Sequence, residues 1–430
     1  MDHDILIEKL NDTELNIRLS ALEELANNFK KGSSDSSYKD VNNHIHTWYS
    51  FSPYSPSKAV WAALSAGLDT AGIMDHDSVA GALEFIEAGR IAKLPVTVGA
   101  ELRVDMKNTP VAGRRINNPD QDDVIYMAIH GIAHTRIKEV QDFFGPVQKH
   151  RNIRNQKMTE NINNLTQKYV GRLDYEMDVI PVSKSHEGGS VTERHLLFAL
   201  AGKIIATYGK GHKVTEFLSN TLNIKLSPKN MTYLNDENNI YYQYDLLGAL
   251  KSDMVEKFYI PAKQECPDVK TVLNFVGKIG AISAYAYLGD VEDSVTGDKK
   301  AQKFEDDYIL QLFSVLKDLG FDAVTYMPSR NTVSQLDRVK ALCTQYEFME
   351  ISGEDINSPR QDFICKALRD KRYQNLVSST YALINHEISA TENITKALFS
   401  DKVKSDYPDL NERIKIYSEE FIKRRKNMKI

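Results

Sequence analysis

The feature that most constrains the fold is an alternation of short apolar segments with longer amphipathic ones. It runs through residues 40–104 and returns over residues 279–355. Residues 40–46 (DVNNHIH) fit a short strand, and residues 55–68 fit a helix with Ser55 or Ser57 as its N-cap. Further strands are expected at 70–78 and 94–104, with a helix at 79–92 between them. Strand followed by helix, repeated, predicts parallel strands and the α/β class.

Other stretches do not follow this alternation, and we divide the chain accordingly. Residues 4–30 carry one apolar stripe at helical spacing and predict a single helix. The middle of the chain is polar and helix-rich, which favours an inserted lid. The expected units are listed here: a helical N-terminal extension at 1–35, a barrel at 40–135 and 270–390, a helical insertion or lid at 136–269, and a C-terminal helical tail at 391–430.

Composition excludes several classes of protein. The formal net charge of -5 gives no electrostatic case for nucleic acid binding. No apolar run approaches the roughly 18 residues needed to span a bilayer. The three cysteines form no CxxC pair, and the acidic N-terminus has no signal-peptide core. We therefore expect a cytoplasmic protein whose metal site, if it has one, is built from His and carboxylates. A homo-oligomer stays open.

Unusual polar residues fall where each predicted strand passes into its loop. In a parallel barrel these strand ends converge on one mouth, where active sites are built. His44 and His46 lie two apart, so on a strand they point to the same face. The residues at these strand ends are His44, His46, Asp75, His76, Asp77, Glu101, His130, His134, Asp290, Glu354, Asp355 and Asn357.

The residue types at these positions suit a metal centre. Imidazoles and carboxylates together bind Zn, Mn or Fe(II). A bound ion makes hydroxide available near neutral pH, so the implied reaction is metal-assisted hydrolysis. A guanidinium fork suits a substrate phosphate. Candidate substrate-binding residues near the strand ends or on the lid are Arg103, Arg194, His195, Arg330 and Arg360, although His195 begins an apolar helix and also fits a helix-start role.

The motifs resemble those of the PHP (polymerase and histidinol phosphatase) family of metal-dependent phosphoesterases. The matching motifs are an HxH at His44-Ile45-His46, a DH pair at Asp75-His76, a GxE at Gly99-Ala100-Glu101, a later strand-end His at His130, and a closing DxH position at Asp355-Ile356-Asn357. The resemblance implies a distorted (β/α)7 TIM-like barrel. It also implies metal ligation by His44, His46, His76, Glu101, His130 and Asp355, and catalytic roles for His76, His130 and Asp75. The segment RHLLFAL resembles a family segment that would place Arg194 or His195 near a substrate phosphate.

The chain also departs from the family pattern. Tyr285 or Tyr287 stands in place of a late-strand His, and Asn357 stands in place of the final His. We therefore expect one to two divalent ions (Mn, Zn or Fe) rather than three, with His134, Asn357, Tyr285 or Asp290 as additional or substituted ligands. Tyr126 is an alternative to His130 at its strand position.

Three functions follow from these observations. The first is a phosphoesterase that hydrolyses a small phosphorylated metabolite with metal-activated water. The second is a catalytically degenerate barrel that binds a small molecule or a partner. The third is hydrolysis of an amide or lactone by the same chemistry. No GxSxG segment occurs, which argues against a serine hydrolase of that type.

Overall fold

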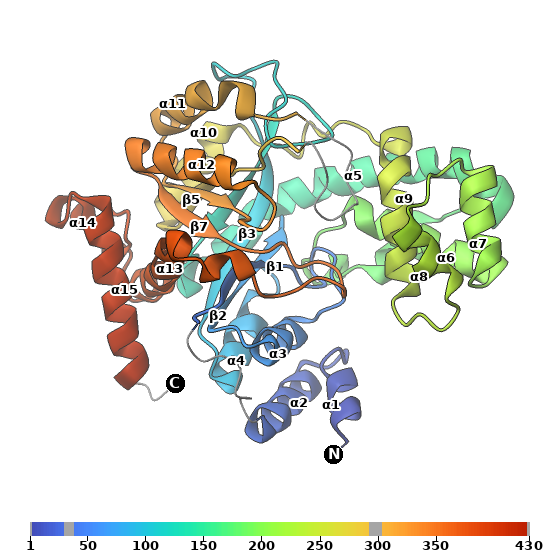
Figure 1. Cartoon of the computed structure of the whole chain (residues 1–430), viewed down its shortest axis with the longest axis horizontal. Coiled ribbons are helices and arrows are strands. Elements are labelled where there is room, and N and C mark those ends of the chain that lie inside the picture. The colour runs from blue at the N-terminus through green and yellow to red at the C-terminus, as the bar shows by residue number, and fades with distance from the viewer. Residues whose placement is uncertain (1, 30–37, 292–302, 428–430) are drawn as a thin grey trace.

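A seven-stranded barrel forms the centre of the computed structural model, which describes residues 2–29, 38–291 and 303–427 (Figure 1). The strands lie side by side in chain order: β1 (Val41–Ile45), β2 (Thr70–His76), β3 (Val96–Asp105), β4 (Val124–His130), β5 (Ile282–Ala286), β6 (Ala323–Tyr326) and β7 (Met349–Ser352). A bridge between Ile45 and Ile356 joins β1 to the segment after β7 and nearly closes the sheet. The predicted α/β class and distorted barrel are confirmed.

One strand contradicts the expectation of parallel pairing. β4 runs antiparallel to both β3 and β5, whereas the other neighbours are parallel. The reason lies in the connection 106–123, which is described throughout and contains no helix. Without a crossover helix the chain returns directly beside β3, and this connection gives antiparallel pairing. The end of β4 therefore lies at the opposite end of the barrel from the ends of its neighbours.

Helices cover the outside of the barrel where the alternation predicts them. α3 (Pro56–Ala66) begins at Ser55, whose side chain accepts from the Lys58 amide, and ends at Gly67 with a φ of 93°. The remaining barrel helices are α4 (Ala82–Ala92), α10 (Val269–Ile279), α11 (Ile309–Leu319), α12 (Val333–Tyr346) and α13 (Gln374–Glu392). Alternate strand residues face these helices or the interior, as a period of two requires. Ile73 and Leu102 belong to the outer core, while Met74 and Ala128 belong to the inner one.

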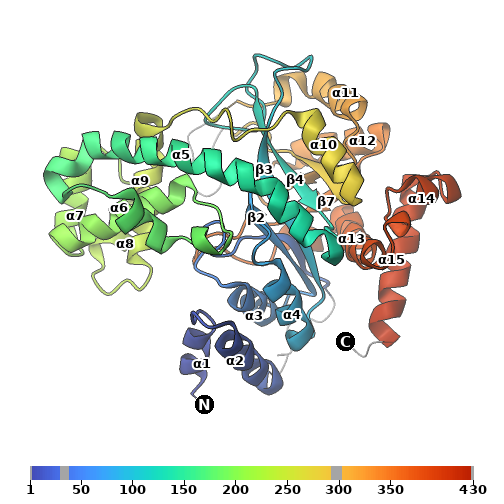
Figure 2. The ribbon, with the colours of Figure 1, turned by 180° about the vertical axis from the view of Figure 1, so that it is seen from behind.

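A helical insertion lies between β4 and β5 and extends to one side of the barrel (Figures 1 and 2). It consists mainly of α5 (Ile137–Val170), α6 (Glu193–Tyr208), α7 (His212–Glu216), α8 (Pro228–Asn235) and α9 (Tyr242–Phe258). It has its own apolar core, which includes Met158, Leu200 and Leu246. The long helix α5 reaches from the barrel to the far side of the insertion (Figure 2).

The two ends of the chain pack on the barrel from different sides (Figure 1). The predicted single helix at 4–30 is wrong, because the chain forms α1 (His3–Lys9) and α2 (Leu15–Asn28). Asn11 lies at the break, where its side chain bonds Pro53 O and the Ser55 amide. At the other end α14 (Asp401–Asp406) precedes α15 (Leu410–Asn427), which packs against α13. Within the described residues, none of the helices combines the length and the apolar character that crossing a bilayer requires.

Candidate metal centre

Three histidines and two carboxylates meet at the mouth of the barrel. His44 Nε2 and His46 Nε2 are 3.2 Å apart. Glu101 Oε2 lies 3.8 Å from His44 Nε2 and 3.2 Å from His76 Nδ1. On the other side of the pair, Asp355 Oδ1 lies 3.2 Å from His46 Nε2. One ligand atom from each of His44, His46 and Glu101 lies within 4.8 Å of the others, which is close enough for a shared ion.

Strand register brings these side chains together. His76 is the last residue of β2 and pairs with Glu101 of β3, so their side chains stand at the same level of the interior. The bridge between Ile45 and Ile356 sets the segment after β7 beside β1. Asp355 therefore reaches His46, although more than 300 positions separate them in the chain. Parallel neighbours with equal register place their carboxyl-end side chains in one layer.

Close backbone packing at Gly353 allows this approach. A Cβ atom built on Gly353 would lie 2.6 Å from His44 Cβ and 2.8 Å from the His44 amide nitrogen. Real side chains do not approach this closely, so a residue with a Cβ would push β1 and the segment after β7 apart. Gly353 is thus a steric requirement of the centre.

Burial tunes the ionisation of the cluster. Burial, with the charge of His46, lowers the pKa of His44 to about 4, and burial also holds the pKa of His76 well below its usual range. Neutral imidazoles keep the lone pairs that metal ligation needs. Burial raises the pKa of Glu101 to about 7. For Asp355 burial acts in the same direction, but the hydrogen bond and charge of His46 outweigh it and hold that pKa well below its usual range.

A divalent cation fits this set of donors. Imidazole nitrogens and carboxylate oxygens are the ligands of Zn, Mn and Fe, and the buried carboxylates gain from a nearby positive charge. Asn357 Nδ2 donates to Asp355 Oδ1 at 2.5 Å, and Asn357 Oδ1 is buried with no hydrogen-bond partner in the described structure. Asn357 Oδ1 could therefore act as a further metal ligand on the side of Asp355. The number and identity of the ions stay predictions.

Asp75 does not face this centre, which corrects its expected catalytic role. It lies one residue before His76 on β2, so its side chain points to the opposite face. Its carboxylate accepts from the Thr47 amide, from Thr47 Oγ1 and from Ser50 Oγ. Ser50 Oγ also lies 3.1 Å from His46 Nδ1, so Asp75 holds the loop that orients His46. No sequence motif identified Ser50.

Three of the expected substitute ligands are engaged elsewhere. Tyr285 lies on the outward face of β5, where its hydroxyl donates to Glu305 Oε1 at 3.0 Å. The Asp290 carboxylate accepts from the Phe304 amide in the loop after β5. His134 Nε2 bonds Glu387 Oε1 at 2.9 Å, and the other oxygen of Glu387 accepts from the amino-terminal part of β3, at the opposite end of the barrel. Geometry therefore contradicts Tyr285 and His134 as ligands and gives Asp290 a role in its loop.

His130 and Tyr126 share the inward face of β4 but lie at different depths. Because β4 is antiparallel, His130 lies two residues below the level of Glu101, with its Nε2 buried and without a hydrogen-bond partner. Burial and the charge of His44 lower its pKa to about 3. Tyr126 lies higher, with its ring centroid 6.1 Å from that of His76. The ligand and catalytic roles of His130 stay predictions, and Tyr126 is the β4 residue beside His76.

Most of the expected substrate-binding residues have protein partners. Arg103 is buried and pairs with Glu193 at 3.1 Å, and Arg360 pairs with Asp245 at 2.8 Å. His195 Nδ1 accepts from the Thr192 amide in a capping box, and the expected contact of His195 with phosphate stays a prediction. Arg330 lies in the turn after β6, where its amide donates to Met327 O. The charge of Arg194 is among the causes that lower the pKa of Asp355, so this arginine lies near the centre.

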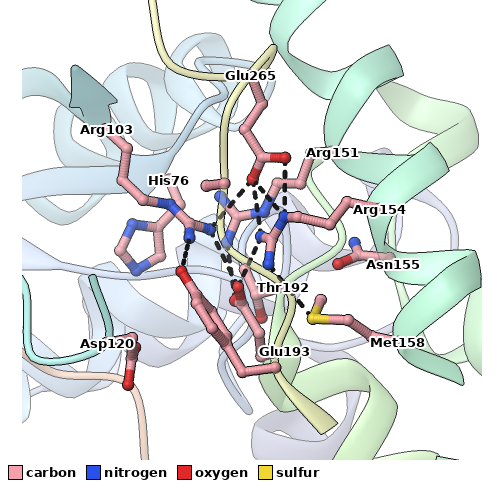
Figure 3. A network of polar contacts seen from close by, with 12 residues as sticks. His76, Arg103, Asp120, Arg151, Arg154, Asn155, Met158, Thr192, Glu193 and Glu265 are labelled. Atoms are coloured by element: carbon pink, nitrogen blue, oxygen red, sulfur yellow. Dashed lines mark hydrogen bonds and ion pairs between the residues drawn. The ribbon is translucent and has the colours of Figure 1, made fainter. Parts of the chain in front are cut away.

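A buried ionic network next to the centre joins the barrel to the insertion (Figure 3). Glu193, at the first turn of α6, receives Arg103 from β3 and both Arg151 and Arg154 from α5. Arg154 also pairs with Glu265 at 2.7 Å, and Arg151 pairs with Asp77 directly after His76. The network fixes the start of α6, and hence Arg194, against the strands of the centre. Sequence reasoning missed it because its members are scattered through the chain.

A family model and one solved structure agree with this fold. The PHP domain family model matches residues 42–219, which run from β1 into the insertion. A solved structure from Bifidobacterium adolescentis, assigned as a metal-dependent phosphoesterase, is 19% identical with a TM-score of 0.50 over 77% of this chain and 94% of that one. An amidohydrolase from Chromobacterium violaceum with bound sulfate is 13% identical, with a TM-score of 0.49 over 76% of this chain and 90% of that one. No curated relative matches the sequence.

Residues 42–219 of the chain match the model of the PHP domain family. The family match and the His/Glu cluster at the mouth of the barrel together support a metal-dependent hydrolase. The expected resemblance to the PHP family is thereby confirmed.

Proposed function

We propose that this protein is a metal-dependent phosphoesterase that acts on a small phosphorylated metabolite. The observation that carries the proposal is the convergence of His44, His46, Glu101 and Asp355 at one mouth, with Arg194 close to Asp355. His44, His46, Glu101 and Asp355 would hold the first ion. Such an ion supplies activated water and neutralises charge on the reacting group.

The substrate would approach from the side of His76 and Asp355. The His76 side chain is 25% exposed and that of Asp355 is 36% exposed, whereas that of His46 is only 2% exposed. A phosphate bound there would meet the guanidinium of Arg194, which suits phosphate oxygens. The lowered pKa of His76 keeps its imidazole neutral, although burial also makes that imidazole a weaker base. His76 is the proposed proton acceptor because Glu101 Oε2 lies 3.2 Å from its Nδ1, where a carboxylate would stabilise the charge that His76 gains.

Metal content per chain is the first test. The protein would be purified without chelators or an affinity tag and analysed by plasma mass spectrometry. We expect at least one ion of Mn, Zn or Fe per chain, and its loss from a His44→Ala/His46→Ala double variant. His212→Ala is the matched control, because His212 is an exposed imidazole on α7, with its side chain 78% exposed.

A substrate panel then separates the three functions. We expect turnover of phosphomonoesters, retained in His212→Ala and lost in the double variant. Turnover of amides or lactones instead would replace the phosphoesterase by an amidohydrolase. Metal binding with no turnover, or no binding after soaking with Mn and Zn, would favour the binding protein.

A further inference from the structure

The segment after β7 that carries Asp355 and Asn357 is braced from within. Gln361 Oε1 accepts from the amides of Asn357 and Ser358, both at 2.7 Å. Gln361 Nε2 donates to Asp355 O, also at 2.7 Å. The bridge between Ile45 and Ile356 holds the same segment to β1. These contacts fold residues 355–361 into a compact turn over the mouth, with its outer end at Arg360.

Arg360 extends from this turn to the insertion. Its Nε donates to Asp245 Oδ1 and its Nη2 to Asp245 Oδ2, both at 2.8 Å. Nη2 also donates to Asn239 Oδ1 at 3.0 Å, and Asn239 Nδ2 donates to Asp245 Oδ2. The guanidinium lies 3.8 Å from the ring centroid of Tyr233 and 5.2 Å from that of Tyr241. A bidentate pair that also stacks on an aromatic ring is geometrically specific.

The contact between Arg360 and Asp245 is shielded and ordered enough to hold the segment after β7 against the insertion. The Asp245 side chain, on α9, is 10% exposed and that of Arg360 is 31% exposed, so the pair is partly shielded from water. Asn239 is itself held by its bond to Tyr233 O. Contacts within the insertion therefore hold Asn239 and Asp245, the two acceptors of Arg360, in place without help from Arg360. An ordered partner restricts the segment that bears Asp355.

We propose that Arg360 is a positioning residue, which fixes the Asp355–Asn357 segment against the insertion and so sets the geometry of the metal centre. This inference rests on the proposed function, because it assigns Asp355 to the metal. Arg360 lies five residues from Asp355 and acts through the turn. The insertion thus contributes to metal affinity through α8 and α9, in addition to the residues that α6 places near the mouth.

The test uses the full chain with Arg360→Ala, Asp245→Ala and the double variant. Arg90→Ala is the matched control, because Arg90 makes a bidentate pair with Glu87 on the exposed face of α4. The first measurement is the affinity for Mn²⁺ or Zn²⁺ by calorimetry. Loss of an outer contact to a metal ligand typically weakens binding by about 10-fold to 100-fold, and we expect about 10-fold for each single variant. The double variant should be no weaker than the singles, and Arg360→Lys should recover part of the loss.

The second measurement is amide hydrogen exchange in the metal-free protein. We expect faster exchange at Asn357 and Ser358 in Arg360→Ala, with the rest of the barrel unchanged. Metal affinity and exchange equal to those of the wild type would overturn the proposal. A wild type that binds no metal would instead contradict the proposed function, and the exchange result alone would then decide whether Arg360 orders the segment.

Discussion

Two sets of acidic and polar side chains follow strands of this barrel, and they behave differently. At the mouth formed by β1, β2 and β3, imidazoles face one another and two carboxylates across short distances. At the end of β5, Tyr285 donates to Glu305, and Tyr287 and Arg338 donate to Asp306. The first set faces inward, with its imidazoles and carboxylates directed at one another, whereas the second set pairs its carboxylates with tyrosine hydroxyls and an arginine. The contrast shows that the phase of a side chain on its strand decides whether it can serve a metal.

The largest expected effect is on metal affinity, and it comes from making the same Glu→Gln substitution at two buried carboxyl groups, Glu101 and Glu305. Burial raises the pKa of Glu101 and of Glu305 to about 7 in both cases. Glu101→Gln removes a charged ligand and should weaken metal affinity by about 100-fold or more, beyond the range for outer contacts. Glu305→Gln keeps an oxygen for Tyr285 and the Leu288 amide and should leave metal affinity unchanged. Equal effects in a metal titration would remove the distinction between the two sets.

The next effect tests steric fit at the mouth. Gly353→Ala places a methyl group against His44 and should lower the free energy of unfolding by about 1–3 kcal/mol, as overpacking does. Gly277→Ala, in α10, meets no atom within 4 Å and should raise it by about 0.5–1 kcal/mol. Chemical denaturation of both variants measures the difference. A Gly353→Ala protein as stable as the wild type would show that β1 and the segment after β7 separate freely.

A smaller effect should come from the loop behind His46. Ser50→Ala removes the hydroxyl that links His46 to Asp75, and should weaken metal affinity by about 10-fold. Ser65→Ala, on the exposed side of α3, is the control and should change nothing. Metal titration of both variants measures the difference. An unchanged affinity in Ser50→Ala would mean that Asp75 holds the loop but does not orient His46 for the metal.

The smallest effect lies at the opposite end of the barrel. Burial of His134 is outweighed by its hydrogen bond to Glu387, which raises the pKa of His134. Its stabilising contribution is therefore complete below the unfolded pKa, near 6.5, and is lost as pH rises through the folded pKa. Because His134 is partly exposed, the contribution should stay below about 1 kcal/mol.

Thermal unfolding of wild type and His134→Gln at several pH values tests this point. The gap between their melting temperatures should shrink as pH rises above about 6.5. His212→Gln corrects for loss of an exposed imidazole. If the difference in melting temperature grew with pH, the neutral form of His134, and not the charged one, would be the form that stabilises the fold.

Much of the fold could be predicted because local chemistry expresses it. Ser55 and Gly67 bound α3 through an N-cap and a left-handed C-cap, and both effects act within one turn. The break between α1 and α2 could not be predicted, because Asn11 bonds residues more than 40 positions away. The direction of β4 departs from the strand–helix alternation because the connection 106–123 before it contains no helix.

The residue types of the candidate centre were determined by the sequence itself: the HxH of His44 and His46, the GxE that contains Glu101, and Asp355. Only the tertiary structure decided which polar residues face inward, because a strand turns successive side chains to opposite sides. It turned Asp75 and Tyr285 away, paired Arg103 and Arg360 with carboxylates of the insertion, and set Arg194 near Asp355. Those pairings join residues far apart in the chain, and packing alone selects them.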